Sequence, residues 1–246
     1  MKRRASLLLV IVILAASLAS CTPPFDAYGQ VLTDVPYCTM DGEAQLLDLY
    51  FPAGGGPWPL VIHVHGGAWM RGDKSEAAGL GAALNAEGYA VAAVNYRLYP
   101  EARFPAYIED VKCAVRYLRA HAGEYNLDPD RFAAVGGSAG GHLVALLGTA
   151  DESAGWDEGE YSRQSSRVQA VIDLSGPSDL SLDFQNGDLA TLMIVAFGSN
   201  QIAAASPVTH ASPDDPPFLI IHGDNDGVVE VEHAYRMNTA LAAAGV

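Results

Sequence analysis

Short apolar segments recur along the chain, and segments with helical character lie between them. The apolar segments lie at residues 44–52, 60–66, 89–98, 131–136, 168–176 and 217–224. Segments that are apolar on both faces are typical of strands inside a parallel sheet. The helical segments lie at residues 75–88, from near Pro105 through Leu118, at 139–148 and at 231–244. This alternation predicts βαβ units, and therefore an α/β fold with a mostly parallel central sheet and helices on both faces.

The N-terminal twenty residues have a different character from the rest. Three basic residues precede an apolar run at 5–17, and the small residues that follow end at Cys21. This order predicts a lipoprotein-type signal peptide over residues 1–20, with Cys21 acylated and the protein exported to the cell envelope. A buried or membrane-spanning helix is the alternative, although the run is shorter than the roughly 20 apolar residues that a bilayer needs.

The rest of the chain divides into a short extension and one folded domain. Residues 21–40 include two adjacent prolines and predict a tether and N-terminal extension. Residues 41–246 are enough for a single domain, since half of the sequence is apolar and only 17% is charged. The formal net charge of −15 argues against nucleic acid and anionic lipid surfaces as partners. Membrane contact is therefore expected only through the lipid anchor.

Two further cysteines, Cys38 and Cys113, remain after Cys21. Export would permit a disulfide between them, but the sequence does not place their Cα atoms within bridging distance. Cys113 lies on the helical face of "DVKCAVRYL", which favours a small buried residue.

A serine stands between glycines where a strand gives way to a helix. Gly136, Ser138 and Gly140 fit the pattern G-x-S-x-G, which presents a nucleophilic hydroxyl at the carboxyl end of a strand. Glycines are needed there because the corner is strained and leaves no room for Cβ atoms. A glycine-rich turn without chemistry is the alternative, but the apolar strand before it and the helix after it favour the nucleophile.

A second glycine-containing loop, "HVHGGAW" at residues 63–69, directly follows a buried strand. Attack on a carbonyl creates an oxyanion, which preorganised backbone N–H groups stabilise. The N–H groups of Gly67, Ala68 and Ala139 are the predicted donors, the last because it follows the nucleophile. His65 is expected to brace this loop.

A carboxylate follows the last apolar segment, in "HGDNDGVV" at residues 222–229. Such a carboxylate could fix the tautomer of a catalytic imidazole. We select Asp226 over Asp224, because its position after Ser138 matches the hydrolase order of serine, acid and histidine. Aspartates at strand ends also act as turn formers or N-caps, which is the alternative.

Several of these segments together resemble one family. "HGGAW", "NYRLYPEARFPAYIEDVKCAVRYLR", "GGSAGGHLVALL", "ASPVTH" and "PPFLIIHGDNDGVV" are similar to α/β-hydrolase esterases of the hormone-sensitive-lipase type, and most similar to their bacterial feruloyl and acetyl-xylan esterase-like branch. The resemblance runs from about Leu47 to the last residue. It implies an α/β-hydrolase fold, Ser138 as nucleophile, Asp226 as acid, and neither a metal nor an organic cofactor.

The catalytic base is where the sequence departs from this resemblance. The family places a histidine after the acid, on a loop beyond one further strand, whereas His233 is the only histidine after Asp226 and lies in a helical segment. His142 resembles a packing position, so its side chain should point away from the site. We therefore expect a C-terminally incomplete sequence that lacks the last strand, the catalytic histidine and the last helix. The resulting open sheet edge should make this polypeptide poorly soluble.

The sequence thus predicts an exported serine esterase that cleaves acetyl, feruloyl or other short acyl esters through an acyl-enzyme. Its substrate would be a small ester or a decorated plant polysaccharide, by analogy with the family. The stretch 175–216 has weak apolar order and is the expected source of selectivity. Two alternatives stay open: an arylformamidase or peptidase of the same fold, and a non-catalytic envelope protein that binds ligands without the triad histidine.

Overall fold

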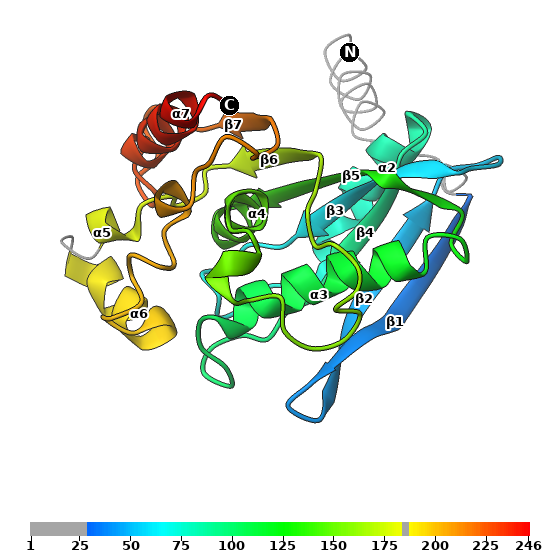
Figure 1. Ribbon diagram of the computed structural model, residues 1–246, viewed down its shortest axis with the longest axis horizontal. Coiled ribbons are helices and arrows are strands. Elements are labelled where there is room, and N and C mark those ends of the chain that lie inside the picture. The colour runs from blue at the N-terminus through cyan, green and yellow to red at the C-terminus, as the bar shows by residue number, and fades with distance from the viewer. Residues whose placement is uncertain (1–28, 184–186) are drawn as a thin grey trace, which may run out of the picture.

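The computed structural model describes residues 29–183 and 187–246. The predicted signal peptide and Cys21 lie outside these residues. The chain forms a seven-stranded sheet in the order β1-β2-β4-β3-β5-β6-β7 (Figure 1). The strands are β1 (Gln30–Met40), β2 (Glu43–Phe51), β3 (Trp58–Val64), β4 (Ala90–Val94), β5 (Leu127–Gly137), β6 (Ala170–Leu174) and β7 (Phe218–Ile221).

The sheet is parallel from β4 through β3, β5 and β6 to β7, and antiparallel where β2 joins β4 and β1 joins β2. The predicted mostly parallel sheet is confirmed. Val64 pairs with Gly136, Gly136 with Asp173, and Asp173 with Ile220. Because these pairs lie near the carboxyl ends of four parallel strands, the loops that follow those strands meet at one edge of the sheet.

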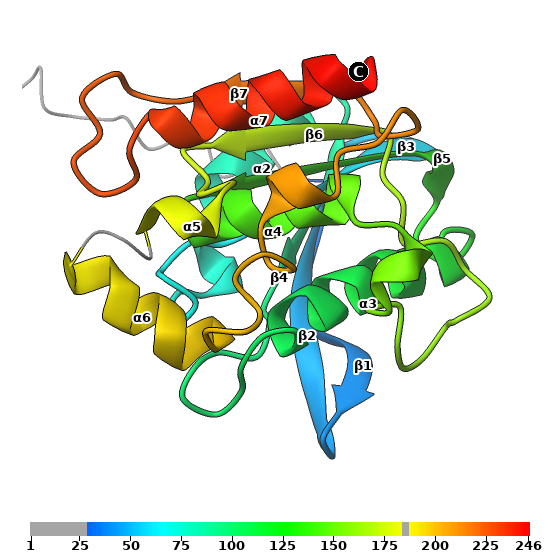
Figure 2. The same cartoon turned by 60° about the vertical axis from the view of Figure 1, so that its left-hand side comes forward.

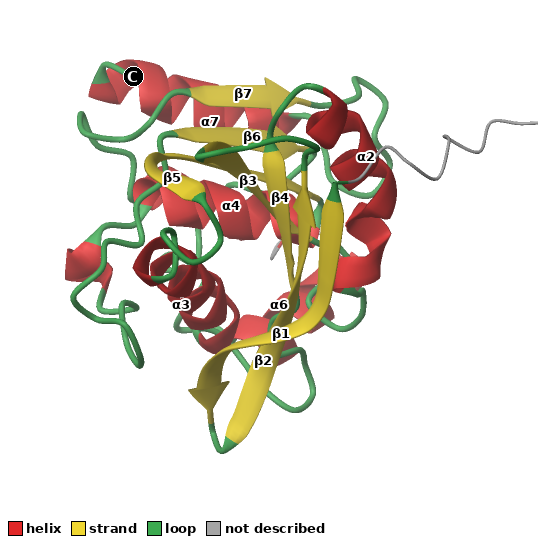
Figure 3. Ribbon diagram, turned by 90° about the vertical axis from the view of Figure 1, so that its right-hand side faces the viewer, coloured by secondary structure: helices red, strands yellow, loops and turns green. Residues whose placement is uncertain are grey.

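Helices cover both faces of the sheet, as expected. Figure 3 shows α2 on one face and α3 and α4 on the other. The helices are α2 (Ala78–Ala86), α3 (Ala106–Ala120), α4 (Ala139–Thr149), α5 (Leu180–Asp183), α6 (Gly187–Phe197) and α7 (Glu232–Ala244), with short 3-10 turns at Lys74–Ala77, Glu152–Ala154 and Pro207–Thr209. Among the described residues, no helix combines the length and the apolar character that crossing a bilayer requires.

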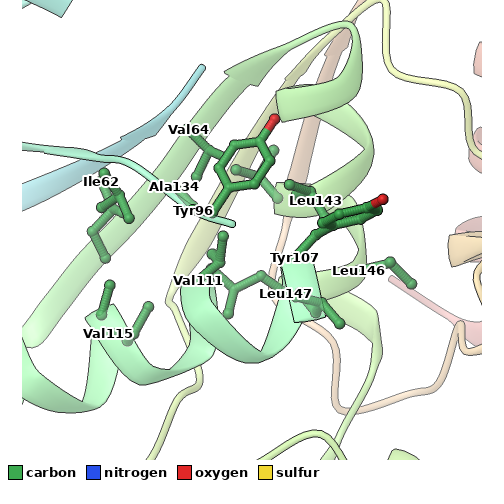
Figure 4. Close-up of a cluster of buried hydrophobic side chains, with 14 of the residues drawn as sticks. Ile62, Val64, Tyr96, Tyr107, Val111, Val115, Ala134, Leu143, Leu146 and Leu147 are labelled. Atoms are coloured by element: carbon green, nitrogen blue, oxygen red, sulfur yellow. The ribbon is translucent and has the colours of Figure 1, made fainter. Parts of the chain in front are cut away.

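Each face of the sheet has its own apolar core. The larger core lies under α3 and α4, where Figure 4 shows Ile62 and Val64 of β3 facing Val111 and Val115 of α3 and Leu143 of α4. The smaller core lies under α2. It is built from Tyr50, Val61, Ala77, Val91, Ala93 and Val135. Strands with buried side chains on both faces explain why their sequences are apolar throughout.

The helix predicted at 75–88 begins differently from the expectation. A 3-10 turn comes first, and its N-cap is Asp73, whose carboxylate accepts the N–H of Ser75 while the Glu76 side chain accepts the N–H of Asp73. This reciprocal capping box ends the loop two residues before Ser75, the predicted N-cap. The α-helix itself ends at Ala86, close to the predicted stop at Gly88.

The extension predicted over residues 21–40 contains a strand that the sequence analysis did not identify. Residues Gln30–Met40 form β1, which pairs antiparallel with β2. The pairing shifts register twice, between Leu32 and Val35 and between Pro36 and Cys38. These irregularities break the alternation of apolar and polar residues by which a strand is recognised in a sequence.

Cys38 and Cys113 form a disulfide with a Cα–Cα distance of 6.4 Å, which joins β1 to α3. Cys113 is fully buried, as predicted, and the pairing that the sequence left open is present. The two residues are 75 positions apart, and the strand that carries Cys38 was not predicted. No local pattern could have paired them.

Arg97, after β4, is a second link between the same elements. Its guanidinium bonds Asp110 of α3, at 3.0 Å from Nε to either carboxylate oxygen, and reaches Asp41 in the turn between β1 and β2. The Asp110 side chain is fully buried, whereas that of Asp41 is 82% exposed.

The opposite edge of the sheet is formed by β7. In the described part of the chain β7 pairs only with β6, and Leu219 and Ile221 are each 53% exposed. Figure 2 shows β7 and α7 together at this end of the sheet. The helix predicted at 231–244 is confirmed as α7.

Candidate active site

Ser138 occupies a strained corner between β5 and α4. Its backbone has φ 53° and ψ −119°, a conformation that residues with side chains rarely adopt. The Ser138 N–H donates to the carbonyl of Leu174 at 2.9 Å, which ties the corner to the end of β6. A Cβ on Gly140 would lie 2.1 Å from the carbonyl oxygen of Val64, and one on Gly136 would lie 2.4 Å from Gly140. The two glycines are therefore sterically required, for the reason predicted.

The loop after β3 carries two of the predicted oxyanion donors. The Gly67 carbonyl accepts the N–H groups of Met70 and Arg71, at 3.1 and 3.2 Å, which closes the loop into a turn. Within the described residues, no hydrogen bond occupies the N–H of Gly67 or of Ala68. The N–H of Ala139, at the first position of α4, also has no acceptor there. Three backbone donors next to the nucleophile are thus not used by the fold itself.

His65 braces this loop, as the sequence suggested. Its ring stacks on Tyr96 with centroids 4.4 Å apart, and its Nδ1 lies 2.8 Å from the carbonyl oxygen of Gly66. Burial lowers the pKa of His65, so the ring is neutral at pH 7. A Cβ on Gly72 would lie 2.2 Å from the same nitrogen, which shows how tightly the loop encloses the ring.

Asp226 lies in the loop after β7, and its own contacts shape that loop. Oδ1 accepts the N–H groups of Val228 and Val229, at 2.9 and 3.0 Å. These bonds hold the pKa of the Asp226 carboxyl below its usual value, so it is ionised at neutral pH. Asp224 is exposed and makes no comparable contacts within the described chain. Of the two acidic residues, Asp226 is the one that the loop positions.

Ser175 connects the acid to the nucleophile, and the sequence analysis did not identify it. The Ser175 N–H donates to the carbonyl of Ile221 at the end of β7, at 2.9 Å, and the preceding residue, Leu174, accepts the N–H of Ser138. Ser175 also makes a small contribution to the lowered pKa of Asp226. Ser175 also has a positive φ of 53°. Two consecutive residues at the end of β6 therefore link the corner that carries Ser138 to the strand that leads to Asp226. A serine after an apolar strand is too common for the sequence to have indicated this role.

A cavity of about 40 Å³ adjoins Ser138. It is lined by Ala68, Trp69, Ser138, Pro177, Leu192, Met193, Val228 and Val229. The loops after β3, β5, β6 and β7 all contribute to it, and α6 supplies Leu192 and Met193. The stretch 175–216, expected to be the source of selectivity, thus provides part of its wall.

None of the seven histidines is hydrogen-bonded to Ser138 within residues 29–183 and 187–246. His142 is fully buried, bonds the carbonyl of Ala205 through Nε2 at 2.7 Å, and has its pKa lowered to about 4 by burial. Nε2 of His222 is 2.8 Å from the carbonyl oxygen of Val229. Nδ1 of His233 accepts the N–H of Ser178 at 3.2 Å. The remaining histidines are His63 on β3, His65 in the loop after it, His121 after α3, and His210 after the last 3-10 turn.

Nothing in the described chain gathers three or more histidine, cysteine, aspartate or glutamate side chains as a metal ion would require. The predicted lack of a cofactor stays a prediction. The structure does show three groups together. The Ser138 hydroxyl lies on a strained corner after β5, backbone donors lie beside it, and the Asp226 carboxylate lies in the loop after β7. Such groups suit nucleophilic attack on a carbonyl carbon.

Comparison with known proteins gives consistent matches. The profile of the BD-FAE family matches residues 47–241. A probable carboxylic ester hydrolase, LipM of Mycobacterium tuberculosis, is 36% identical over 189 residues, covering 73% of this chain and 44% of that protein. Esterase LipQ of the same organism is 30% identical over 238 residues, covering 90% and 55%. The chain therefore spans about half the length of the curated relatives it matches.

Solved structures agree with these sequence matches. A truncated form of a carbohydrate esterase from gut microbiota superposes with a TM-score of 0.83 at 33% identity, covering 91% of this chain and 87% of that one. The thermophilic esterase Est2 of Thermogutta terrifontis, with propionate bound, gives a TM-score of 0.75 at 27% identity, covering 91% and 81%.

Proposed function

Because the chain belongs to the BD-FAE family and has the α/β-hydrolase fold, we propose that the protein hydrolyses carboxylic esters through an acyl-enzyme formed on Ser138. Its relatives are named as ester hydrolases, and its structural neighbours include a carbohydrate esterase. One observation carries the proposal: the corner that bears the hydroxyl lies beside three backbone N–H groups that have no acceptor among the described residues.

The proposed reaction has two halves. Ser138 Oγ attacks the ester carbonyl carbon, a base takes the hydroxyl proton, and the carbonyl oxygen becomes an oxyanion held by the N–H groups of Gly67, Ala68 and Ala139. The tetrahedral intermediate collapses, the alcohol leaves with the proton from the base, and the acyl group stays on Ser138. Water then attacks the acyl-enzyme in the same way and releases the carboxylic acid. Asp226 would orient the base and stabilise its protonated form.

The base in this proposal is none of the seven described histidines. His142 and His233 are buried and bonded elsewhere, and His222 contacts Val229. A decisive assay therefore supplies a base in solution. We would measure hydrolysis of p-nitrophenyl acetate with and without added imidazole, and subtract the rate of the Ser138→Ala variant, which records the background reaction of imidazole itself.

With a base present, kcat/KM should exceed that of Ser138→Ala by about 10²-fold or more. Asp226→Asn should lower the Ser138-dependent rate in the presence of imidazole, because Asp226 would stabilise the protonated base, whereas Asp224→Asn, two residues away, should not. Equal rates for the unaltered protein and Ser138→Ala, with and without imidazole, would remove the esterase proposal. That result would favour the non-catalytic binding protein, the alternative that the histidine positions support.

The arylformamidase or peptidase alternative is separated by substrate. N-formylkynurenine and a peptide p-nitroanilide test amide hydrolysis under the same conditions. We expect the Ser138-dependent rate to be greater with p-nitrophenyl acetate.

We also propose that the protein is exported and anchored to the cell envelope through an acylated Cys21. The basic and apolar residues before Cys21 support export, and so does the disulfide between Cys38 and Cys113, since structural disulfides persist in oxidising compartments. Mass spectrometry of the N-terminus should find a lipid-modified Cys21, and Cys21→Ala should release the protein from membranes. An unmodified N-terminus at Met1 would contradict this.

A further inference from the structure

The small cavity beside Ser138 bears on a choice that the proposed function leaves open, between short acyl groups and feruloyl groups. We propose that this cavity holds the acyl group, that Met193 limits its depth, and that the protein is selective for uncharged acyl groups of two or three carbons. This inference rests on the proposed function, because it assigns the substrate class of the same site.

The volume of the cavity sets the size limit. A cavity needs about 10–15 Å³ to hold one water, so about 40 Å³ holds about three atoms of that size. An acetyl or propionyl group has two or three carbons. A feruloyl group carries an aromatic ring with methoxy and hydroxyl substituents and exceeds this space several-fold.

The walls of the cavity are apolar and closely packed. Its side chains include no charged group. Met193 is 2% exposed and Trp69 is 3% exposed. The indole of Trp69 is held edge-on against Phe197, with centroids 4.8 Å apart, and against His142 at 5.2 Å. A wall fixed in this way on two sides does not widen without displacing buried rings.

The acyl part of the ester is the part that fits. The alcohol must leave the site before water can attack, and a sugar within a polysaccharide cannot enter a space of about 40 Å³. Val228, at the same cavity, is 68% exposed and marks a side that meets solvent. The alcohol would therefore lie on the solvent side and the acyl group inside.

Met193 is the residue to test, because α6 offers a matched neighbour. Met193 lines the cavity and is buried, whereas Ile194 is 45% exposed and does not line it. Leu192 is a second lining residue and is only partly buried. Shortening Met193 or Leu192 enlarges the cavity, and shortening Ile194 removes a similar volume from the surface.

The experiment compares p-nitrophenyl acetate, butyrate and octanoate, together with methyl ferulate, under conditions that give a Ser138-dependent rate. One methylene that a pocket cannot take costs about 10-fold, and octanoate has at least five carbons more than the cavity is proposed to hold. Acetate should therefore exceed octanoate in kcat/KM by well over about 100-fold. Met193→Ala should reduce this ratio by about 10-fold or more, through faster octanoate hydrolysis. Ile194→Ala should leave the ratio within about twofold.

Leu192→Ala provides the same test if Met193→Ala fails to fold. The inference is overturned if octanoate or methyl ferulate is hydrolysed as well as acetate, or if enlarging the cavity changes selectivity among alcohols and not among acyl groups. The proposed function would then still stand, since every rate would remain Ser138-dependent. A lack of Ser138-dependent hydrolysis with all four esters would overturn both.

Discussion

The two edges of the sheet are built in opposite ways. The β1 edge has two register shifts, contains Pro36, and is bonded covalently to α3. The β7 edge is regular and apolar, has the sequence Phe-Leu-Ile-Ile, and pairs with β6 alone in the described part of the chain. Bulges and prolines on an edge hinder further strand pairing, whereas a flat apolar edge permits it. Of the two edges in the described residues, the β1 edge is the one with features that hinder further strand pairing.

The two edges also differ in their distance from the proposed active site. The β1 edge lies far from the proposed site in the strand order, and covalent and ionic links hold it. The loop after β7 carries Asp226, and it is shaped mainly by hydrogen bonds that this carboxylate accepts from Val228 and Val229. Substitutions at the β1 edge should therefore change folding, and those at the β7 edge should change association and the acid.

The largest effect expected at the β1 edge is loss of the disulfide. The bond closes a loop of 75 positions, for which the chain-entropy relation gives about 4 kcal/mol of stabilisation. The double variant Cys38→Ala, Cys113→Ala should lose about that much free energy of unfolding in urea. Hydrogen exchange should quicken in β1 and remain unchanged in β7. A loss below about 1 kcal/mol would show that β1 does not depend on the bond.

The next largest effect compares two of the three carboxylates that bond Arg97, those of Asp110 and Asp41. Asp110→Asn leaves a mostly buried guanidinium without its main partner and should cost about 3 kcal/mol. Asp41 is 82% exposed, so Asp41→Asn should cost about 0.5 kcal/mol or less. Urea denaturation of both variants measures the contrast. Equal costs would mean that the β1–β2 turn, and not α3, is what Arg97 stabilises.

The sequence predicted the centre of the molecule better than its edges. Strands β3 to β7 have apolar segments that stop at polar or glycine residues, so pattern alone located them. The corner at Ser138 was predictable because its glycines are required by contacts of 2.1 and 2.4 Å, and steric need of this kind leaves a local signature.

Features that depend on distant residues left no such signature. β1 escaped because Asp34 has a φ of 56° and the strand shifts register on both sides of Val35 and Pro36, which breaks its alternation. The disulfide joins positions 75 apart. Ser175 links to β7, the strand before Asp226, only because β6 and β7 lie side by side. Such contacts are set by topology, which no single segment encodes.

The stability of the β7 side of the sheet should depend on pH through Asp173. Asp173 on β6 is 1% exposed and has its pKa raised to about 6 by burial, a shift that the hydrogen bond it accepts from the Gly176 N–H at 2.8 Å opposes. A raised carboxyl pKa means that the folded state prefers the neutral form. The stabilisation of the folded state by protonated Asp173 is complete below about pH 4 and is lost as pH rises through 6.

Asp173→Asn keeps the neutral shape and should therefore match the unaltered protein at pH 4 and exceed its stability by about 2–3 kcal/mol at pH 8. Urea denaturation at four pH values between 4 and 8 measures this. Asp224→Asn, at an exposed position, should have nearly the same free energy of unfolding as the unaltered protein at every pH. A variant that is less stable at pH 8 would show that the Asp173 charge is used by the fold.

A charge placed on each edge of the sheet should have the smallest effect on folding. It also tests most directly whether the β1 and β7 edges differ in their tendency to pair with another chain. Leu219→Lys on β7 should change the free energy of unfolding by about 0.5 kcal/mol or less, because the side chain is already 53% exposed. Lysine on an edge strand opposes pairing with another chain, so self-association measured by sedimentation should fall. Val31→Lys on β1, where Val31 is 38% exposed, should leave association unchanged, because the β1 edge is already irregular. If both substitutions reduce association equally, the edges do not differ in the way their sequences suggest, and general surface charge governs solubility instead.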